Sequence, residues 1–257
     1  MDANYSRPAR QIVTRLVLYN ICYGIGTVRK RDLALHGARY VIGNQSNLQA
    51  VADYIAEFKA DIVGLVEVDC GSLRARRVNQ AEVIAEQLGH YTAYSCKYGK
   101  NSINQYLPIL RKQSNAFLAN DIIHGERFHY FDEGVKKLII ELEMEHYAIF
   151  LVHLSLQFKQ RQLQLKRLYD LISETDKPVI VAGDMNTFAG DKELTLFKQA
   201  AGMRSANEEH LPSFPSWRPK MELDFILYQD GIEIENFEIP QTTLSDHLPL
   251  VCDFSLR

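Results

Sequence analysis

Short apolar runs of strand length recur along this chain, and they often follow one another with no helical pattern between them. The last three such runs lie at 223–228, 232–239 and 248–254. A doubly wound parallel sheet would alternate strands and helices more strictly. The pattern therefore predicts an α/β (α+β) fold in which a pair of mixed β-sheets has helices outside it. We expect one domain over residues 1–257, with residues 1–10 as a poorly ordered tail.

The remaining elements are predicted from periodicity and end signals. Leu48, Val51 and Ile55 recur at helical spacing, with Ser46 or Asn47 as the N-cap. Glycine is expected to end two other helices, at Gly89 and Gly202. The predicted helices are 47–59, 80–88, 159–174 and 192–201. Further strands are predicted at 12–19, 61–68, 137–143, 147–154 and 179–182, and two short ones within 91–120 around a polar loop at 97–105.

Composition limits the class of protein. The net charge is −3 and the pI is about 6.2, so the strongly basic balance of many nucleic-acid-binding proteins is absent, although a local basic patch remains compatible. The four cysteines form no Cys-x-x-Cys pair, which indicates reduced thiols and neither a disulfide framework nor a zinc site. The first ten residues lack the apolar run of a signal peptide, and no stretch is long and apolar enough to span a bilayer. We therefore expect a cytoplasmic protein.

Polar residues fall at the ends of several predicted strands. Four of them directly follow apolar runs, and two directly precede them. If the last strands run antiparallel to the earlier ones, all six residues share one rim of the fold. The four that follow strands are Asn20, Glu67, His153 and Asp184, and the two that precede them are Asp224 and His247.

These residue types fit metal-assisted chemistry on a phosphate. Glu67 and Asn20 offer the oxygen ligands that Mg²⁺ prefers, with Mn²⁺ as a substitute, whereas zinc would need a His/Cys cluster. Asp184 can align or deprotonate a water. Asn186 can hold that water or a phosphate oxygen.

Two imidazoles complete the predicted rim. His247 needs a partner that fixes its tautomer and stabilises its cation, and Asp224 is a suitable carboxylate. His153 would be a second imidazole facing the phosphate. Each of these residues alone has an ordinary structural explanation, such as a solvated Glu67 or an Asx-type turn at Ser245-Asp246-His247. Their joint occurrence in this order is what favours a functional site.

The ordered set of motifs resembles the endonuclease/exonuclease/phosphatase superfamily, in particular its deoxyribonuclease-like and sphingomyelinase-like phosphodiesterases. The resemblance spans nearly the whole chain, and each motif is weak without the others. The matching pieces are Leu18-Tyr19-Asn20, Val63-Gly64-Leu65-Val66-Glu67, His153-Leu154-Ser155-Leu156, Val181-Ala182-Gly183-Asp184-Met185-Asn186, Glu222-Leu223-Asp224-Phe225-Ile226 and Leu244-Ser245-Asp246-His247-Leu248-Pro249.

The resemblance implies a four-layered sandwich and a magnesium-dependent hydrolysis of a phosphoester by in-line attack of water. It implies that Asp246 is an acidic group near Glu67 and Asn20 at the metal end. His153 matches the branches in which two histidines face the phosphate, and this favours a phosphodiester over a monoester. Which of Asp184 and His247 is the base stays open.

The chain departs from the family pattern in its middle part. Members often carry Gly-Asn-Ala-Ile-Leu-Ser-Arg there, whereas this chain has Ser114-Asn115-Ala116-Phe117-Leu118-Ala119-Asn120. Asn115 is kept, which implies a supporting role in substrate binding. A family arginine before the next strand corresponds to Lys137, which is a point charge and cannot clamp an anion as arginine does. These departures concern the substrate and leave the predicted catalytic set complete.

Two loops are candidates for substrate contact. The loop after Glu67 contains Arg74 in a basic run, which either meets an anionic group or is a solvated connection to the next helix. A Pro- and aromatic-rich loop at 212–219 carries Trp217 and Arg218. Trp217 either forms a wall for a base, a sugar or a lipid head group, or packs on the core.

Three functions therefore compete. The first is a phosphodiesterase for a small or lipid-derived diester, which the low net charge favours. The second is a repair-type nuclease for DNA or RNA, which would need a basic groove and salt-sensitive binding. The third is a catalytically silent binding protein on the same fold, which would have no need of the complete set of acids, amides and histidines.

Overall fold

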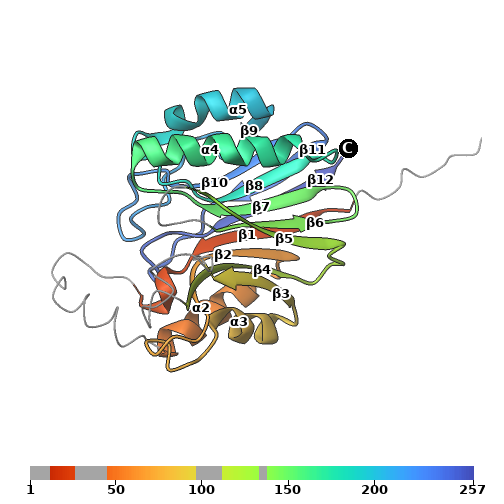
Figure 1. Cartoon of the computed structure of the whole chain (residues 1–257). Coiled ribbons are helices and arrows are strands. Elements are labelled where there is room, and N and C mark those ends of the chain that lie inside the picture. Colours follow the sequence, from red (N-terminus) through yellow and green to blue (C-terminus); the bar gives the residue numbers. More distant parts are fainter. Residues whose placement is uncertain (1–11, 27–44, 97–111, 133–137) are drawn as a thin grey trace, which may run out of the picture.

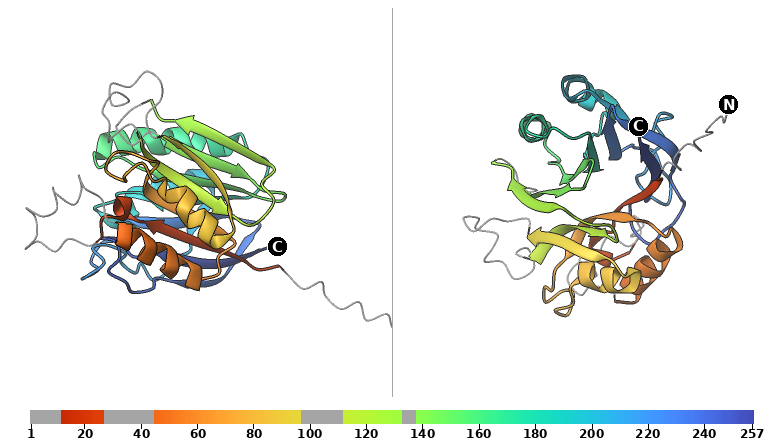
Figure 2. Two further views of the ribbon diagram at one scale, coloured as in Figure 1. Left: turned by 90° about the horizontal axis from the view of Figure 1, so that it is seen from below. Right: turned by 90° about the vertical axis from the view of Figure 1, so that its right-hand side faces the viewer.

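Two six-stranded mixed sheets pack face to face, and helices cover their outer faces (Figures 1 and 2). The computed structural model describes residues 12–26, 45–96, 112–132 and 138–257. The predicted four-layered sandwich is thus confirmed. The expectations for the tail at 1–10, the polar loop at 97–105 and Lys137 lie outside the described residues.

The first sheet holds the N-terminal strands and the two strands at the C-terminus. Its strand order is β11-β12-β1-β2-β4-β3. Strands β1 and β2 run parallel, whereas β12 runs antiparallel to β1. The strands are β1 (Thr14–Asn20), β2 (Ile62–Asp69), β3 (Tyr91–Cys96), β4 (Gln113–Ala119), β11 (Ile232–Glu238) and β12 (Leu250–Leu256).

The second sheet is built from consecutive strands of the middle of the chain. Its order is β5-β6-β7-β8-β10-β9. Strands β7 and β8 run parallel, and β10 runs antiparallel to β8. The strands are β5 (Gly125–Tyr130), β6 (Leu138–Glu143), β7 (Ala148–His153), β8 (Val179–Asp184), β9 (Met203–Ser205) and β10 (Asp224–Gln229).

Three apolar layers hold the sandwich together. Between the sheets, Leu18 and Phe254 of the first sheet pack in one cluster with Ile140 of the second. A second cluster joins the first sheet to α2 (Gln45–Glu57) and α3 (Gln80–Leu88). A third joins the second sheet to α4 (Phe158–Ser173) and α5 (Thr195–Ala201). No helix of the described residues is long and apolar enough to cross a membrane.

The structure differs from the sequence prediction in a few elements. The edge strand β5 was missed because its side chains are mostly exposed or half-buried, so it lacks the apolar signature of a strand. The short strand β9 was missed as well. The helix predicted at 192–201 is divided into a 3₁₀ turn, η5 (Gly190–Leu194), and α5. The hydrogen-bond pattern changes from 3₁₀ to α between Leu194 and Thr195. Gly89 and Gly202 do end their helices in the left-handed conformation.

The predicted cap of α2 was also wrong. The helix begins at Gln45, so Ser46 and Asn47 lie inside its first turn. The Asn47 side chain instead donates hydrogen bonds to the carbonyls of Gly24 (3.2 Å) and Leu244 (3.0 Å). It thereby joins the loop after β1 to the loop before β12, which both lead into the predicted site.

Candidate active site

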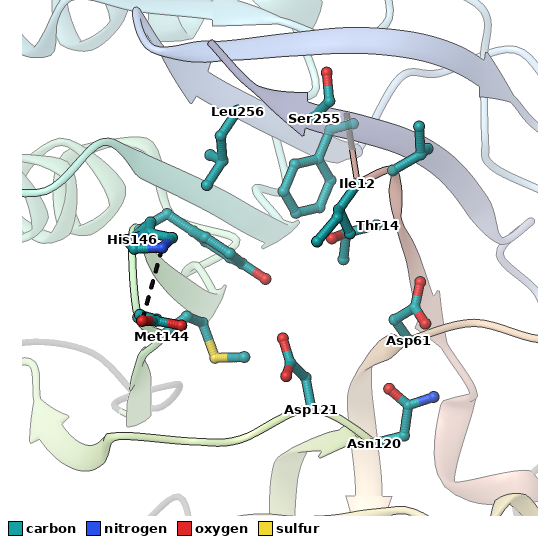
Figure 3. Close-up of a pocket in the computed structure, with 13 residues that line it drawn as sticks. Ile12, Thr14, Asp61, Asn120, Asp121, Met144, His146, Ser255 and Leu256 are labelled. Carbon is teal, nitrogen blue, oxygen red and sulfur yellow. Dashed lines mark ion pairs between the residues drawn. The ribbon is translucent and has the colours of Figure 1, made fainter. Parts of the chain in front are cut away.

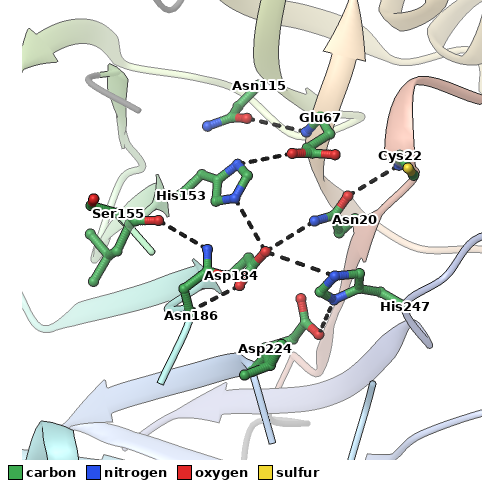
Figure 4. Close-up of polar contacts among 12 residues, drawn as sticks. Asn20, Cys22, Glu67, Asn115, His153, Ser155, Asp184, Asn186, Asp224 and His247 are labelled. Atoms are coloured by element: carbon green, nitrogen blue, oxygen red, sulfur yellow. Dashed lines mark hydrogen bonds and ion pairs between the residues drawn. The ribbon is translucent and has the colours of Figure 1, made fainter. Parts of the chain in front are cut away.

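The predicted polar residues meet at one end of the sandwich (Figure 4). Asn20 and Glu67 lie at the carboxyl ends of the parallel strands β1 and β2, and His153 and Asp184 lie at those of β7 and β8. Asp224 begins β10, which runs antiparallel to β8, so it pairs directly with Asp184. The segment that carries His247 leads into β12, which runs antiparallel to β1. Because the strands run in opposite directions, the carboxyl ends of some strands and the amino ends of others meet at one rim.

Asp184 is the centre of this rim. Its Oδ2 accepts a hydrogen bond from Asn20 Nδ2 (3.1 Å) and lies 3.2 Å from His153 Nε2 and 3.9 Å from His247 Nε2. Its Oδ1 accepts a hydrogen bond from the backbone N–H of Asn186 (3.0 Å). The carboxylate is 2% exposed, so these contacts act in a low-dielectric environment where they are strong. One carboxylate oxygen thus faces donors from three different segments.

His247 is held from its other side by a buried carboxylate. Its Nδ1 lies 2.8 Å from Asp224 Oδ2, and that oxygen also accepts a hydrogen bond from Ser213 Oγ (2.6 Å). The ring packs against Phe214 with centroids 4.7 Å apart. The sequence singled out this Pro- and aromatic-rich loop but gave Ser213 and Phe214 no role, because nothing in its composition indicates that it supports a carboxylate. Together these contacts fix the ring with Nε2 toward Asp184.

The charge of His247 follows from its neighbours. Burial alone would lower its pKa, but the carboxylates of Asp224, Asp184 and Asp246 outweigh burial and raise the pKa from 6.5 to about 10. Burial raises the pKa of Asp224, and the adjacent His247 opposes that rise. At neutral pH the ring is therefore an imidazolium whose Nδ1–H donates to Asp224, while its Nε2 lies 3.9 Å from Asp184 Oδ2 as a charge pair.

This arrangement predicts how stability depends on pH. A raised histidine pKa contributes stability that is complete below the unfolded value of 6.5 and is lost as the pH rises through about 10. We expect the free energy of unfolding of the wild-type protein to fall between these pH values by more than that of a His247→Gln variant. Denaturant melts in metal-free buffer at both ends of the window measure the difference. Parallel pH profiles of the two proteins would contradict the assigned charge.

Glu67 reaches the site through an irregularity in β2. The pairing of β2 with β4 shifts register between Leu65 and Val68, and Glu67 has a left-handed φ of 58°. Bulges of this kind bend a strand and redirect a side chain. Asn115 supports the bulge, because its Oδ1 accepts a hydrogen bond from the Glu67 backbone N–H (3.3 Å). Its Nδ2 is buried without a hydrogen-bond partner among the described residues, which leaves a donor for a ligand atom.

Three of the predicted site residues, Glu67, Asp246 and Asn20, offer oxygen donors for a metal. Glu67 Oε1 is 3.9 Å from His153 Nδ1, and its side chain is 19% exposed. Burial raises the pKa of Asp246, and repulsion from Glu67 adds to that effect, although His247 opposes it. Two carboxylates that repel each other and an amide oxygen from Asn20 are a donor set that a hard divalent cation suits. The Asn20 Oδ1 also accepts the Cys22 N–H (3.1 Å), so its second lone pair is the one available.

A second group of possible ligands lies deeper. Each of three residues, Asp184, Asp224 and His247, offers one ligand atom, and these three atoms lie within 4.8 Å of one another. His247 Nδ1 is already bonded to Asp224 (2.8 Å), and its Nε2 lies 3.9 Å from Asp184. A magnesium ion would displace the imidazolium and gain a nitrogen ligand that it does not favour. The site at Glu67, Asp246 and Asn20 stays the prediction for the cation.

An ion pair beneath the site joins the loops after β7 and β8. Arg161, in α4, is 2% exposed and pairs with Glu193. Arg161 Nη1 donates to the carbonyls of Ser155 (2.8 Å) and Leu156 (3.0 Å), and Glu193 Oε1 accepts from the backbone N–H of Ala189 (2.8 Å). Asn186 makes a similar link, because its Nδ2 donates to the carbonyl of Leu154 (2.9 Å). The segments that carry His153 and Asn186 are thus held together.

The predicted substrate contacts are placed differently. Arg74 is not a solvated loop residue: it is 2% exposed, pairs with the buried Asp69 (2.8 Å) and stacks 4.3 Å above the Tyr23 ring. Asp69 binds its guanidinium, and contact of Arg74 with a ligand stays a prediction. Trp217 and Arg218 are exposed, and the tryptophan is not part of the apolar clusters of the described residues. The neighbouring Ser216 ties their loop to Ser245 by a hydrogen bond to its carbonyl (2.6 Å).

A cavity of about 550 Å³ lies at the opposite end of the sandwich (Figure 3). It is lined by residues at the start of β1, including Ile12 and Thr14, and by Asp61, Asp121 and Met144. None of the predicted site residues lines it. The polar rim and this cavity are therefore separate features of the described structure.

Comparison with known proteins identifies a family. Residues 18–247 match the Endonuclease/Exonuclease/phosphatase family. A UPF0294 protein of Vibrio parahaemolyticus is 33% identical over 98 residues, which are 37% of this chain and 34% of that protein. A UPF0294 protein of Klebsiella pneumoniae is 31% identical over 112 residues, which are 42% and 40% of the two chains. The chain thus matches less than half the length of these curated relatives.

Solved structures share the fold at low identity. A family member from Bacteroides vulgatus is 17% identical with a TM-score of 0.71, covering 96% of this chain and 100% of that one. The human Nocturnin catalytic domain, with bound sulfate, is 18% identical with a TM-score of 0.66, covering 95% and 94%. ANGEL2, a 2′,3′-cyclic phosphatase in complex with adenosine-2′,3′-vanadate, is 15% identical with a TM-score of 0.66, covering 96% of each chain. The fold agrees with the family match, and the chain belongs to the endonuclease/exonuclease/phosphatase family, whose members are generally hydrolases of phosphoester bonds.

Proposed function

We propose that this protein is a magnesium-dependent phosphodiesterase in which water attacks the phosphorus in line. The observation that carries the proposal is the surrounding of Asp184 Oδ2 by Asn20 Nδ2, His153 Nε2 and His247 Nε2 within 3.9 Å. A fold needs no such convergence of an acid, an amide and two imidazoles. The arrangement instead supports proton transfer and charge stabilisation at one phosphate.

Asp184 is the proposed base for the attacking water. The two ring nitrogens of His247 both face carboxylates, so this ring acts as a donor and is not available as the base. Asn186 supports the water through its Oδ1, because its Nδ2 is already bonded to the Leu154 carbonyl. This division of roles is our proposal for the choice of base that the sequence left open.

The two histidines are proposed to offset charge on the phosphoryl oxygens. His247 presents an imidazolium that is already oriented by Asp224, so little reorganisation is needed when negative charge develops. His153 lies between Glu67 and Asp184 and faces the same space. Asn115 Nδ2 is proposed to donate to a substrate oxygen, since it is buried without a described partner.

Glu67, Asp246 and Asn20 are proposed to hold the metal ion. Mg²⁺ would neutralise phosphate charge and stabilise the leaving oxygen. Repulsion between Glu67 and Asp246 supports this placement, because a cation between them removes it. Mn²⁺ has the same preference for oxygen ligands and is expected to substitute.

Removal of metal tests this assignment. We expect a chelator to abolish hydrolysis and added Mg²⁺ to restore it. Glu67→Gln is expected to raise the Mg²⁺ concentration for half-maximal rate by about tenfold or more, because it removes a charged ligand. Glu145→Gln is the matched control, since Glu145 is exposed and lines the cavity at the opposite end. Full activity of the wild-type protein in the presence of the chelator would contradict the metal assignment.

A phosphodiester is the proposed substrate class, either small or derived from a lipid head group. The presence of two histidines at the phosphate supports a diester. ANGEL2 is described as a 2′,3′-cyclic phosphatase, and a 2′,3′-cyclic phosphate is itself a diester. The net charge of −3 disfavours the alternative of a dedicated nuclease for DNA or RNA. A silent binding protein would not need the buried contacts of Asp184.

A further inference from the structure

Large apolar side chains are exposed on the loops that surround the candidate site. These loops follow β2, β7 and β8 or precede β10, so all of them leave the end of the sandwich that carries Asp184. Single exposed apolar residues are ordinary, but their presence on each of four neighbouring loops is not. The exposed residues, which we name the apolar rim, are Leu73 (63%), Leu156 (58%), Phe158 (60%), Phe188 (51%) and Trp217 (37%).

The same loops carry exposed positive charges. Glu208 and Glu209 are exposed near the start of the segment before β10, but within the described residues of 70–79, 154–160, 186–194 and 212–221, no exposed residue is acidic. The two acids there, Asp191 and Glu193, are half-buried and pair with Lys198 and Arg161. A chain with a net charge of −3 thus presents a locally cationic face around the site. The exposed cations are Arg76, Arg77, Lys159, Lys192, Arg218 and Lys220.

Hydrogen bonds hold these loops in place. The Arg77 backbone N–H donates to the Ser72 carbonyl (2.9 Å), which closes the turn that presents Leu73. Arg161 binds the Leu156 carbonyl (3.0 Å). The Ser216 backbone N–H donates to the Asp246 carbonyl (2.7 Å) beside Trp217. The backbone that carries these apolar side chains is therefore held in place. Exposing them to water costs free energy, and a binding partner would remove that cost.

We propose that the apolar rim and its cations are a docking surface for an anionic lipid–water interface. Leucine, phenylalanine and tryptophan side chains interleaved with lysine and arginine are the composition that binds the boundary between head groups and acyl chains. Charge complementarity favours anionic lipids. Leu73 and Leu156 have no π face on which a base could stack, which favours a lipid surface over single-stranded nucleic acid.

This docking goes beyond the proposed hydrolysis. The residues of the apolar rim are not among those that contact Asp184. Binding to the lipid surface therefore needs neither the Asp184 carboxylate nor a metal. Docking in this orientation would place the polar residues around Asp184 at the level of the lipid phosphates. A lipid-derived diester would then reach Asp184 without leaving the interface.

Vesicle sedimentation tests the proposal. The protein of 257 residues is mixed with vesicles of phosphatidylglycerol and phosphatidylcholine in equal parts, and with pure phosphatidylcholine vesicles. We expect wild type and Asp184→Asn to bind the anionic vesicles equally and the neutral ones less. The double variant Leu73→Ser/Phe188→Ser is expected to bind about tenfold more weakly or worse, since it removes two apolar side chains from the interface.

Matched controls separate this result from loss of fold or of catalysis. Tyr91→Ser/Ile122→Ser removes two side chains that are 72% and 75% exposed at the other end of the sandwich, and it should bind as wild type does. Thermal melts verify that both double variants fold.

Equal vesicle binding by wild type and the Leu73→Ser/Phe188→Ser variant would overturn the proposal, as would no binding by either. Rim-dependent binding of a single-stranded oligonucleotide without vesicle binding would assign the surface to nucleic acid instead. Because Asp184→Asn is inactive under the proposed function, its vesicle binding tests docking alone.

Discussion

Replacing Asp184 with asparagine is expected to lower kcat for phosphodiester hydrolysis by about a thousandfold or more. The substitution keeps the shape of the side chain but removes the proposed base and the charge that faces His153 and His247. Loss of a positioned base and of electrostatic stabilisation each cost about 10²–10⁴ in rate. Steady-state kinetics with saturating Mg²⁺ measures the effect.

Asp191→Asn is the matched control for that change. Asp191 lies in the turn η5 after the same strand but pairs with Lys198 (2.6 Å), which no site residue contacts. Its variant should keep a rate close to that of the wild-type protein. An Asp184→Asn protein that folds and retains the wild-type rate would show that Asp184 has no part in catalysis.

Replacing Gly183 with alanine is expected to destabilise the protein by about 3 kcal/mol or more. A Cβ at this position would lie 2.0 Å from the carbonyl oxygen of Val152 and 2.9 Å from its carbonyl carbon. These are backbone atoms of the paired strand β7, which cannot move aside as a flexible side chain can. The parallel pairing of β7 and β8 would therefore open next to His153 and Asp184. A fall in Tm of roughly 10 °C is the expected result of a melt.

Gly190→Ala separates the clash from the backbone conformation. Gly190 has a left-handed φ of 76°, but a Cβ there meets nothing within 4 Å. Its variant should lose only about 1–2 kcal/mol, the cost of a left-handed residue that has a side chain. Equal stability losses for the two variants would contradict the close approach at Gly183.

The sequence predicted the rim because strand ends can be read from apolar runs. Asp184 and His153 each come directly at the end of such a run, and Asp224 comes at the start of one. Strand direction could not be read in this way, and the parallel and antiparallel pairs of the structure supply it. The layered fold followed from the same pattern.

Contacts between distant segments could not be predicted in this way. The bulge at Glu67 depends on a hydrogen bond from its backbone to Asn115, 48 residues away. The basic run around Arg74 predicted either contact with an anionic group or a solvated loop, but a buried Asp69 five residues earlier binds its guanidinium. The support of Asp224 by Ser213 leaves no periodic signal. Such pairs depend on tertiary packing, which local spacing does not encode.

The most direct test of the central claim is a hydrolysis assay on a panel of nucleic acids, nucleotides, phospholipids and phosphomonoesters with Mg²⁺. Wild type is compared with Asp184→Asn and His247→Ala in each reaction. The proposed function predicts that wild type cleaves at least one diester of the panel and that both variants lose this activity. Equal background from all three proteins on every substrate would contradict it.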